Sequence, residues 1–152
     1  MTPSGALYGE ADAVISSELR ELSAYSTILA AIARGENKLN DIFHATGFSR
    51  AKISVYLKNL ATFNIVEKVV SFVTGGWENA KKGVYQIKDT FVNFWFKFVY
   101  PNMSNLYLLS PEEFYDTYIE KELDAYLERY FREVCTEYLL CLLYTSPSPR
   151  DA

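Results

Sequence analysis

Apolar residues recur at helical spacing through the first part of the chain and predict two helices there. A short helix is expected over Ala11–Leu22, and a second helix over Ser23–Arg34. Gly35 follows the second helix, and glycine tolerates the positive φ that is common just past a helix end. The stripe of the second helix that is expected to face the core consists of Tyr25, Ile28, Leu29 and Ile32.

The segment from Asn40 to Lys68 has the pattern of a helix-turn-helix that leads into a strand. Its first helix is expected to stop at Thr46 and Gly47, and Ser49 is expected to cap its second helix. The residues expected to face the core are Leu39, Ile42 and Phe43 in the first helix and Ile53, Leu57 and Leu60 in the second. This pattern is typical of a module that binds nucleic acid.

A β-hairpin is predicted after the helix-turn-helix. Ile65–Thr74 is rich in β-branched residues and favours a strand, which Gly75 and Gly76 interrupt. Trp77–Lys82 is expected to form a loop, and Gly83–Ile87 resumes an extended pattern. Three helices followed by a hairpin predict a mainly α fold, a winged helix-turn-helix whose wing is the hairpin.

An aromatic-rich helix is predicted over Thr90–Tyr100, with Asp89 as its cap and Pro101 as its stop. Asn102–Asn105 is expected to be a polar turn. The aromatic residues of the helix are Phe91, Phe94, Trp95, Phe96 and Phe98. Aromatic residues at helical spacing are usually core residues, and stacking on bases is the alternative.

The last predicted helical segment begins with a capping box. Ser110 stands at the N-cap, Pro111 at the first helical position and Glu113 at the third. One or two helices are expected from there to about Leu143. Their expected apolar face consists of Leu123, Tyr126, Leu127, Tyr130, Phe131, Val134 and Tyr138.

Charge is distributed unevenly along the chain, whose formal net charge is -4. Residues 22–88 hold nine Lys or Arg against four Asp or Glu, whereas both flanking parts are acidic. A basic island inside an acidic chain favours an anionic partner, or docking of that island onto acidic parts of the same protein.

The second helix of the helix-turn-helix is therefore a candidate for recognition of double-stranded DNA. Short side chains there allow close approach to a groove, and cations reach phosphates or guanine edges. Its expected outer face comprises Arg50, Ala51, Lys52, Ser54, Val55, Lys58 and Asn59. The predicted DNA contacts are Arg50, Lys52, Ser54 and Lys58, with Lys81 and Lys82 on the wing. The alternative is that the winged helix is a protein-interaction module.

Catalytic chemistry has little support in the sequence. Every Ser/His/Asp or Cys/His arrangement would depend on the single histidine, His44, for which a surface or packing role is expected. The acids Glu112, Glu113, Asp116 and Glu120 favour a solvated helix start over a metal site. No G-x-x-x-x-G-K-[ST] run occurs. Cys135 and Cys141 favour reduced thiols, and no apolar run reaches the roughly 20 residues that span a bilayer, so a cytoplasmic protein is expected.

Residues Tyr85 to Asn102, YQIKDTFVNFWFKFVYPN, resemble the Y-x-I-x-D-x-F-x-x-F-W-x-x-F-V-x-P signature of a family of archaeal and bacterial ATP-binding proteins. These are AAA+/STAND-type ATPases whose C-terminal domain has no known function. Leu7 to Glu21 is similar to the linker after the ATPase module, and Ile28 to Lys68 is similar to the winged helix. Leu123 to Leu139 resembles the start of the terminal domain.

The resemblance implies a domain organisation. Residues 1–21 would be a linker from an ATPase module, residues 22–88 the winged helix, and residues 89–140 the helical start of the C-terminal domain. The ATPase module, with its ATP and Mg²⁺, would precede Met1 and is a candidate partner. A restriction-nuclease-like terminal domain would continue beyond Leu140. This chain itself is expected to be neither an enzyme nor a binder of a cofactor.

Residues 141–152, CLLYTSPSPRDA, differ in character from the rest of the chain. A Ser-Pro-Ser-Pro run cannot continue a helix, and the segment is similar to translated adaptor or vector sequence. These residues are interpreted as a non-native tail and are given no role in the function.

Overall fold

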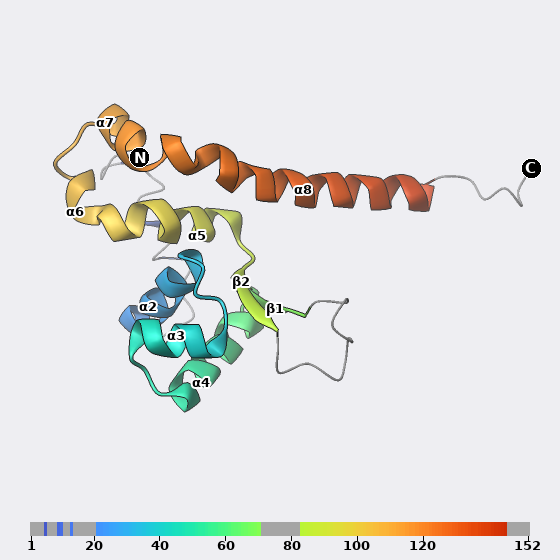
Figure 1. Ribbon diagram of the computed structural model, residues 1–152, viewed down its shortest axis with the longest axis horizontal. Coiled ribbons are helices and arrows are strands. Elements are labelled where there is room, and N and C mark those ends of the chain that lie inside the picture. Colours follow the sequence, from blue (N-terminus) through green and yellow to red (C-terminus); the bar gives the residue numbers. More distant parts are fainter. Residues whose placement is uncertain (1–4, 6–8, 11–12, 14–20, 71–82, 146–152) are drawn as a thin grey trace, which may run out of the picture. The chain divides into compact units, whose positions relative to one another are not determined.

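A computed structural model describes residues 5, 9–10, 13, 21–70 and 83–145 of the protein (Figure 1). Over these residues the chain is mainly α-helical with one two-stranded antiparallel sheet, which confirms the predicted fold class. The chain divides into two compact units, Met1–Leu108 and Leu109–Ala152. The helix expected over Ala11–Leu22 and the hairpin tip expected at Trp77–Lys82 lie largely outside the described residues.

Three helices open the first unit: α2 (Leu22–Ala33), α3 (Leu39–Thr46) and α4 (Arg50–Thr62). α2 packs against α3, and α3 packs against α4. The predicted inner stripes are confirmed for the buried residues Tyr25, Ile28, Leu29, Ile32, Ile42, Ile53, Leu57 and Leu60. Leu39 and Phe43 are only half-buried, so the inner face of α3 is narrower than predicted.

Gly47 and Ser49 set the turn between α3 and α4, as predicted. Gly47 has a φ of 69°, and its N–H donates to the carbonyl of Phe43 at 3.0 Å, which ends α3. The Ser49 hydroxyl accepts a hydrogen bond from the N–H of Lys52 at 3.3 Å and so caps α4. Two short-range devices therefore fix where α4 begins.

A left-handed residue, Asn64, ends α4 and turns the chain into the sheet. Asn64 has a φ of 61°, and its N–H donates to the carbonyl of Ala61 at 3.1 Å. The N–H of Ile65 donates to the carbonyl of Leu60 at 2.9 Å, and the two bonds together form a Schellman motif. Asn64 Oδ1 also accepts from Lys88 Nζ at 3.0 Å, which ties this turn to the residue after the hairpin.

The sheet is the base of the predicted hairpin. β1 (Val66–Val69) and β2 (Val84–Ile87) pair antiparallel, with Lys68 opposite Tyr85. The N–H of Tyr85 donates to the carbonyl of Asn37 at 2.7 Å. The segment between α2 and α3 therefore bonds to β2 as well, and joins the hairpin to the helices.

The helical segment after the hairpin does not stop at Pro101, which corrects the prediction. It starts as predicted, because the Asp89 carboxylate accepts from the N–H of Val92 at 2.8 Å. It then continues through four consecutive elements. These are α5 (Thr90–Phe94), the π-helical turn η3 (Trp95–Val99), the 3-10 turn η4 (Tyr100–Asn102) and α6 (Met103–Leu106).

A change of helix type accommodates Pro101. Proline lacks an N–H, and in an α-helix its ring clashes with the carbonyl four residues earlier. Here a wider π turn precedes Pro101, and the proline lies at the start of a tighter 3-10 turn. The side-chain amide of Asn102 donates to the carbonyl of Phe98 at 2.9 Å, so a carbonyl in the irregular region is paired. The expected polar turn over Asn102–Asn105 is consequently helical.

The aromatic residues of this irregular helix belong to the core of the first unit. α2 contacts β2, α5 and η3. Trp95 and Phe96 are completely buried, and Phe98 is 2% exposed. The prediction of core residues is confirmed for these three rings, which have no face open for stacking on a base, whereas Phe91 and Phe94 are half-buried.

The second unit contains α7 (Pro111–Tyr118) and α8 (Glu120–Thr145), which pack against each other. The predicted capping box is present: Ser110 Oγ accepts from the N–H of Glu113 at 3.2 Å, and the Glu113 carboxylate accepts from the N–H of Ser110 at 3.0 Å. Four residues of the predicted apolar face of α8 are each at least half exposed: Leu127, Phe131, Val134 and Tyr138.

Replacing Gly47 with alanine is expected to lower the free energy of unfolding by about 1–2 kcal/mol, because a Cβ disfavours the left-handed conformation. An added Cβ at Gly47 would meet no atom within 4 Å, so the loss would come from the backbone alone. Urea denaturation measures it. Gly47→Asn is the control and should lose less, since asparagine tolerates this conformation. Equal stability of Gly47→Ala and the unsubstituted protein would contradict the turn described here.

Candidate nucleic-acid interface

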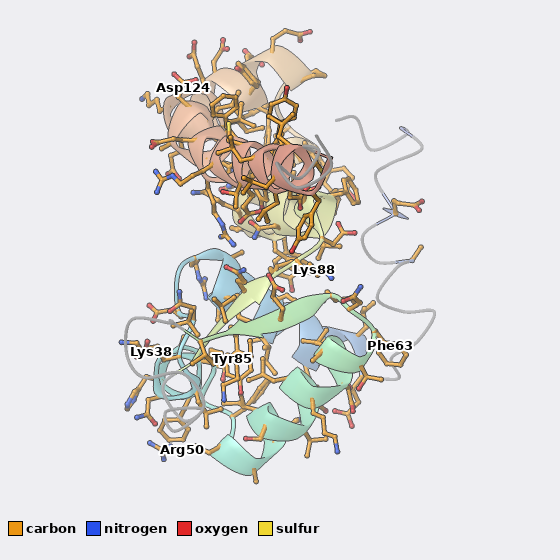
Figure 2. All side chains as sticks on the ribbon, turned by 90° about the vertical axis from the view of Figure 1, so that its right-hand side faces the viewer. Lys38, Arg50, Phe63, Tyr85, Lys88 and Asp124 are labelled. Atoms are coloured by element: carbon orange, nitrogen blue, oxygen red, sulfur yellow. The ribbon has the colours of Figure 1, made fainter. Side chains whose placement is uncertain are left out.

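The outer face of α4 is the surface on which the predicted DNA contacts meet. Arg50, Ser54 and Lys58 are exposed on this helix, opposite the buried stripe. Short residues lie among them, and Val55 is 58% exposed. Figure 2 shows Arg50 and Phe63 at opposite ends of α4, with Arg50 at the end where the helix begins. The interface candidates therefore run from the N-terminus of α4 along its outer side.

Arg50 is held at the start of α4 by two contacts with α3. Its Nε donates to Asn40 Oδ1 at 3.0 Å, and its guanidinium carbon lies 4.2 Å from the centre of the Phe43 ring. The Nε bond uses one of the five N–H donors of a guanidinium. The half-buried Phe43 ring therefore orients the Arg50 guanidinium, and Arg50 itself stays exposed.

Lys52 is less exposed than the sequence suggests, because an acid and two aromatic rings surround its ammonium. Lys52 Nζ lies 3.7 Å from Glu21 Oε2, 4.7 Å from the centre of the Phe48 ring and 5.3 Å from that of Tyr56. The Tyr56 hydroxyl donates a hydrogen bond to the same oxygen of Glu21. A charged cluster thus joins the residue before α2 to α4.

The Glu21–Tyr56 hydrogen bond changes the acidity of both partners. The hydrogen bond from Tyr56, and then the positive charge of Lys52, lower the pKa of the Glu21 carboxyl below its ordinary value of 4.5. The hydrogen bond to Glu21, together with burial of the phenol, raises the pKa of Tyr56 to about 12. Glu21 is therefore a carboxylate at neutral pH, directly beside a predicted DNA contact.

Sequence reasoning assigned no role to Glu21, although Lys52 and Tyr56 lie one helical turn apart on α4. No local signal connects Glu21 to them, because the hydrogen-bonded residues are 35 positions apart in the chain.

Asn59 was expected on the outer face, but it is half-buried and bound to α2. Its side-chain amide donates to the Tyr25 hydroxyl at 2.8 Å, and the rings of Tyr25 and Tyr56 lie 4.4 Å apart between centres. The side of α4 that carries Tyr56 and Asn59 therefore packs against α2.

Ser54 and Lys58 differ in the contacts that their side chains make within the protein. The Ser54 hydroxyl donates to the carbonyl of Arg50 at 2.8 Å, within the helix. Lys58 is exposed, and no carboxylate of the described ranges 21–70 and 83–145 forms an ion pair with its ammonium. Lys58 is thus a cation on α4 whose charge is open to an outside partner. The two remaining predicted contacts, Lys81 and Lys82, lie outside the described residues.

Other chemical candidates have structural surroundings of their own. His44 is exposed and lies edge-on to the Phe43 ring, 5.1 Å between centres. The hydrogen bond from the Ser110 backbone, and then the one with its side chain, lower the pKa of Glu113.

Within the part of the chain that the structure describes, no group of three or more His, Cys, Asp or Glu could hold a metal ion. None of the described helices is long and apolar enough to cross a membrane.

Comparison with known proteins gives a relationship without a function. Residues 95–151 match the model of a family, DUF234, described as archaeal and bacterial proteins of unknown function. The match begins at η3, runs through α8 and reaches into the segment interpreted as a tail. The uncharacterized protein MJECL04 of Methanocaldococcus jannaschii is 33% identical over 132 residues, which is 86% of this chain. The chain spans 29% of the length of that relative. No solved structure matches this chain.

The Glu21 contacts are expected to stabilise the fold only while the carboxyl is ionised. Because the pKa of Glu21 is lower in the folded state, its contribution to the free energy of unfolding is fully present above pH 4.5. This contribution is lost as the pH falls through the pKa of the folded state. Glu21→Gln should therefore lower the free energy of unfolding near neutral pH, with a smaller effect at about pH 3. Urea denaturation of both proteins at the two pH values checks this.

Tyr56→Phe is the matched background for that comparison, since it removes the hydroxyl that binds Glu21. In that background the effect of Glu21→Gln near neutral pH should shrink. An equal effect of Glu21→Gln at both pH values would contradict the assignment.

Proposed function

We propose that this chain binds double-stranded DNA through the outer face of α4, with Arg50, Lys52, Ser54 and Lys58 as its contacts. The observation that carries the proposal is the composition of that face. The exposed cation Arg50 lies at the N-terminus of α4 and the exposed cation Lys58 lies further along the helix, with short residues between them. The opposite face of α4 is committed to the core.

The dimensions of DNA suit such a surface. The major groove is about 12 Å wide and admits an α-helix. Ala51, Ser54 and Val55 project little, so the helix backbone can approach the base edges. The N-terminus of α4 carries a partial positive charge from the helix dipole, and Arg50 lies beside it. Phosphates on one side of the groove would meet Arg50, and Lys58 would reach the groove about two turns further along α4.

The hairpin would supply the contacts that flank the groove. β1 and β2 lead into residues 71–82, which include Lys81 and Lys82. In this proposal both lysines bind the phosphate backbone next to the groove that α4 enters. They would strengthen binding without reading sequence, since phosphates carry no sequence information directly.

We further propose that the longer protein to which this chain corresponds binds ATP and Mg²⁺ in another part of its sequence. Support comes from the resemblance of Tyr85 to Asn102 to a family of ATP-binding proteins, and from a relative of which this chain spans only 29%. Calorimetry with ATP and Mg²⁺ should show binding to the longer protein and none to residues 1–152. Binding of ATP by residues 1–152 alone, or by neither protein, would contradict this assignment.

Replacing Lys58 with glutamate is expected to weaken DNA binding about tenfold and to flatten its dependence on salt, because a phosphate contact becomes a repulsion. Lys52→Glu combined with Lys58→Glu should abolish binding. Fluorescence anisotropy with a short mixed-sequence duplex, at about 50 and about 200 mM salt, measures both effects. Lys121→Glu makes the same charge change at an exposed residue of α8 instead of α4 and is the matched control.

Two outcomes would overturn the DNA proposal. One is an equal loss of affinity in Lys58→Glu and Lys121→Glu, which would mean that binding depends only on the net charge of the protein. The other is unchanged affinity in the double variant. Binding of a protein partner that persists at high salt would instead favour a protein-interaction module, because apolar docking is not screened by ions.

A further inference from the structure

We infer that Glu21 is a built-in competitor for Lys52: its carboxylate occupies the position beside the lysine ammonium that a DNA phosphate would take. This inference rests on the proposed function and adds a regulatory contact to it. Glu21 Oε2 lies 3.7 Å from Lys52 Nζ, and the Tyr56 hydroxyl binds the same oxygen. Both partners of the carboxylate are on α4, four residues apart, and one of them is a proposed DNA contact.

The base of α2 holds the competitor in place. Glu21 is the residue directly before α2, and its carbonyl accepts from the N–H groups of Ala24 and Tyr25 at 3.1 and 3.3 Å. α2 is a core helix, with Ile28 and Leu29 fully buried. The Glu21 backbone therefore has a fixed position relative to α4, and the carboxylate reaches Lys52 without any movement of the fold.

The contact is weak enough to be displaced. The side chains of Lys52 and Glu21 are 41% and 64% exposed, and exposed ion pairs contribute little in water. Contact of the lysine with a DNA phosphate also releases condensed counterions, a gain in binding free energy that one carboxylate does not offer. Lys52 can therefore exchange Glu21 for a phosphate.

Glu21 would keep its hydrogen bond to Tyr56 after Lys52 has moved. Tyr56 is a buried residue, and its ring lies 4.4 Å from that of Tyr25, between centres, on the side of α4 that faces α2. The negative charge would then remain close to the DNA backbone and oppose binding. Glu21 thus acts twice, first by holding Lys52 and then by repelling phosphate, and both effects lower affinity.

The test is DNA affinity of the Glu21→Gln variant, measured by anisotropy with a short mixed-sequence duplex. Affinity at about 50 mM salt should rise about threefold to fivefold, and the salt slope should steepen by less than about 0.9, the value of one whole phosphate contact, because Lys52 reaches a phosphate in both proteins. Glu36→Gln, on an exposed residue of the loop before α3, removes one negative charge elsewhere and should change affinity less. Glu21→Asp, whose carboxylate is one methylene shorter, should give a smaller gain and serves if Glu21→Gln does not fold.

A Lys52→Gln background separates the specific contact from general repulsion. If Glu21 acts through Lys52, part of the gain from Glu21→Gln should disappear there. An equal gain in the two backgrounds would overturn the competition, and so would equal gains from Glu21→Gln and Glu36→Gln. Unchanged affinity in Glu21→Gln would overturn the competition alone, while the DNA proposal would stand. Absence of duplex binding by all the proteins would overturn both.

Discussion

The packing of α4 against the rest of the first unit is the constraint on which this structure depends. Ile53, Leu57 and Leu60 are buried at one helical face, and Asn59 hydrogen-bonds to Tyr25 at the side. These contacts fix the rotation of α4 about its own axis. A rotation of one residue, about 100°, would bring Ser54 and Lys58 into the core and turn Tyr56 out to the exposed position of Val55. The composition of the outer face follows from the demands of the inner one.

Short-range turns then place α4 between two other elements. Gly47 lets the chain leave α3 in a left-handed conformation, and Asn64 does the same where α4 gives way to β1. The bond from Lys88 to Asn64 closes the hairpin onto this second turn. Figure 2 shows Lys88 just past the end of β2, the strand that contains Tyr85. The hairpin thereby starts from a defined position at the C-terminal end of α4.

Most of the secondary structure could be predicted because its signals are local. Ser49, Asp89 and Ser110 each accept the backbone hydrogen bond that their position in the sequence predicts. The stop at Pro101 was wrong for a non-local reason. Burial of Trp95 and Phe96 favours a continuous helical path, and π and 3-10 turns absorb the proline.

The candidate site was predictable only in outline. Helical periodicity placed Arg50, Ser54 and Lys58 on the outer face of α4, where the structure has them. The same periodicity could not show that Lys52 is held by Glu21, since that contact depends on how α2 packs. It also could not show that Asn59 is turned toward Tyr25. Local patterns identify faces of a helix, whereas tertiary packing decides which charges on a face are already engaged.

The central claim is that the outer face of α4 meets DNA, and amide NMR of the ¹⁵N-labelled protein during titration with a short duplex tests it most directly. The account predicts that the largest shift changes occur at Arg50, Ala51, Ser54, Val55 and Lys58, and that amides of α8 stay in place. Shift changes that leave α4 untouched, or that concentrate on α8, would contradict it.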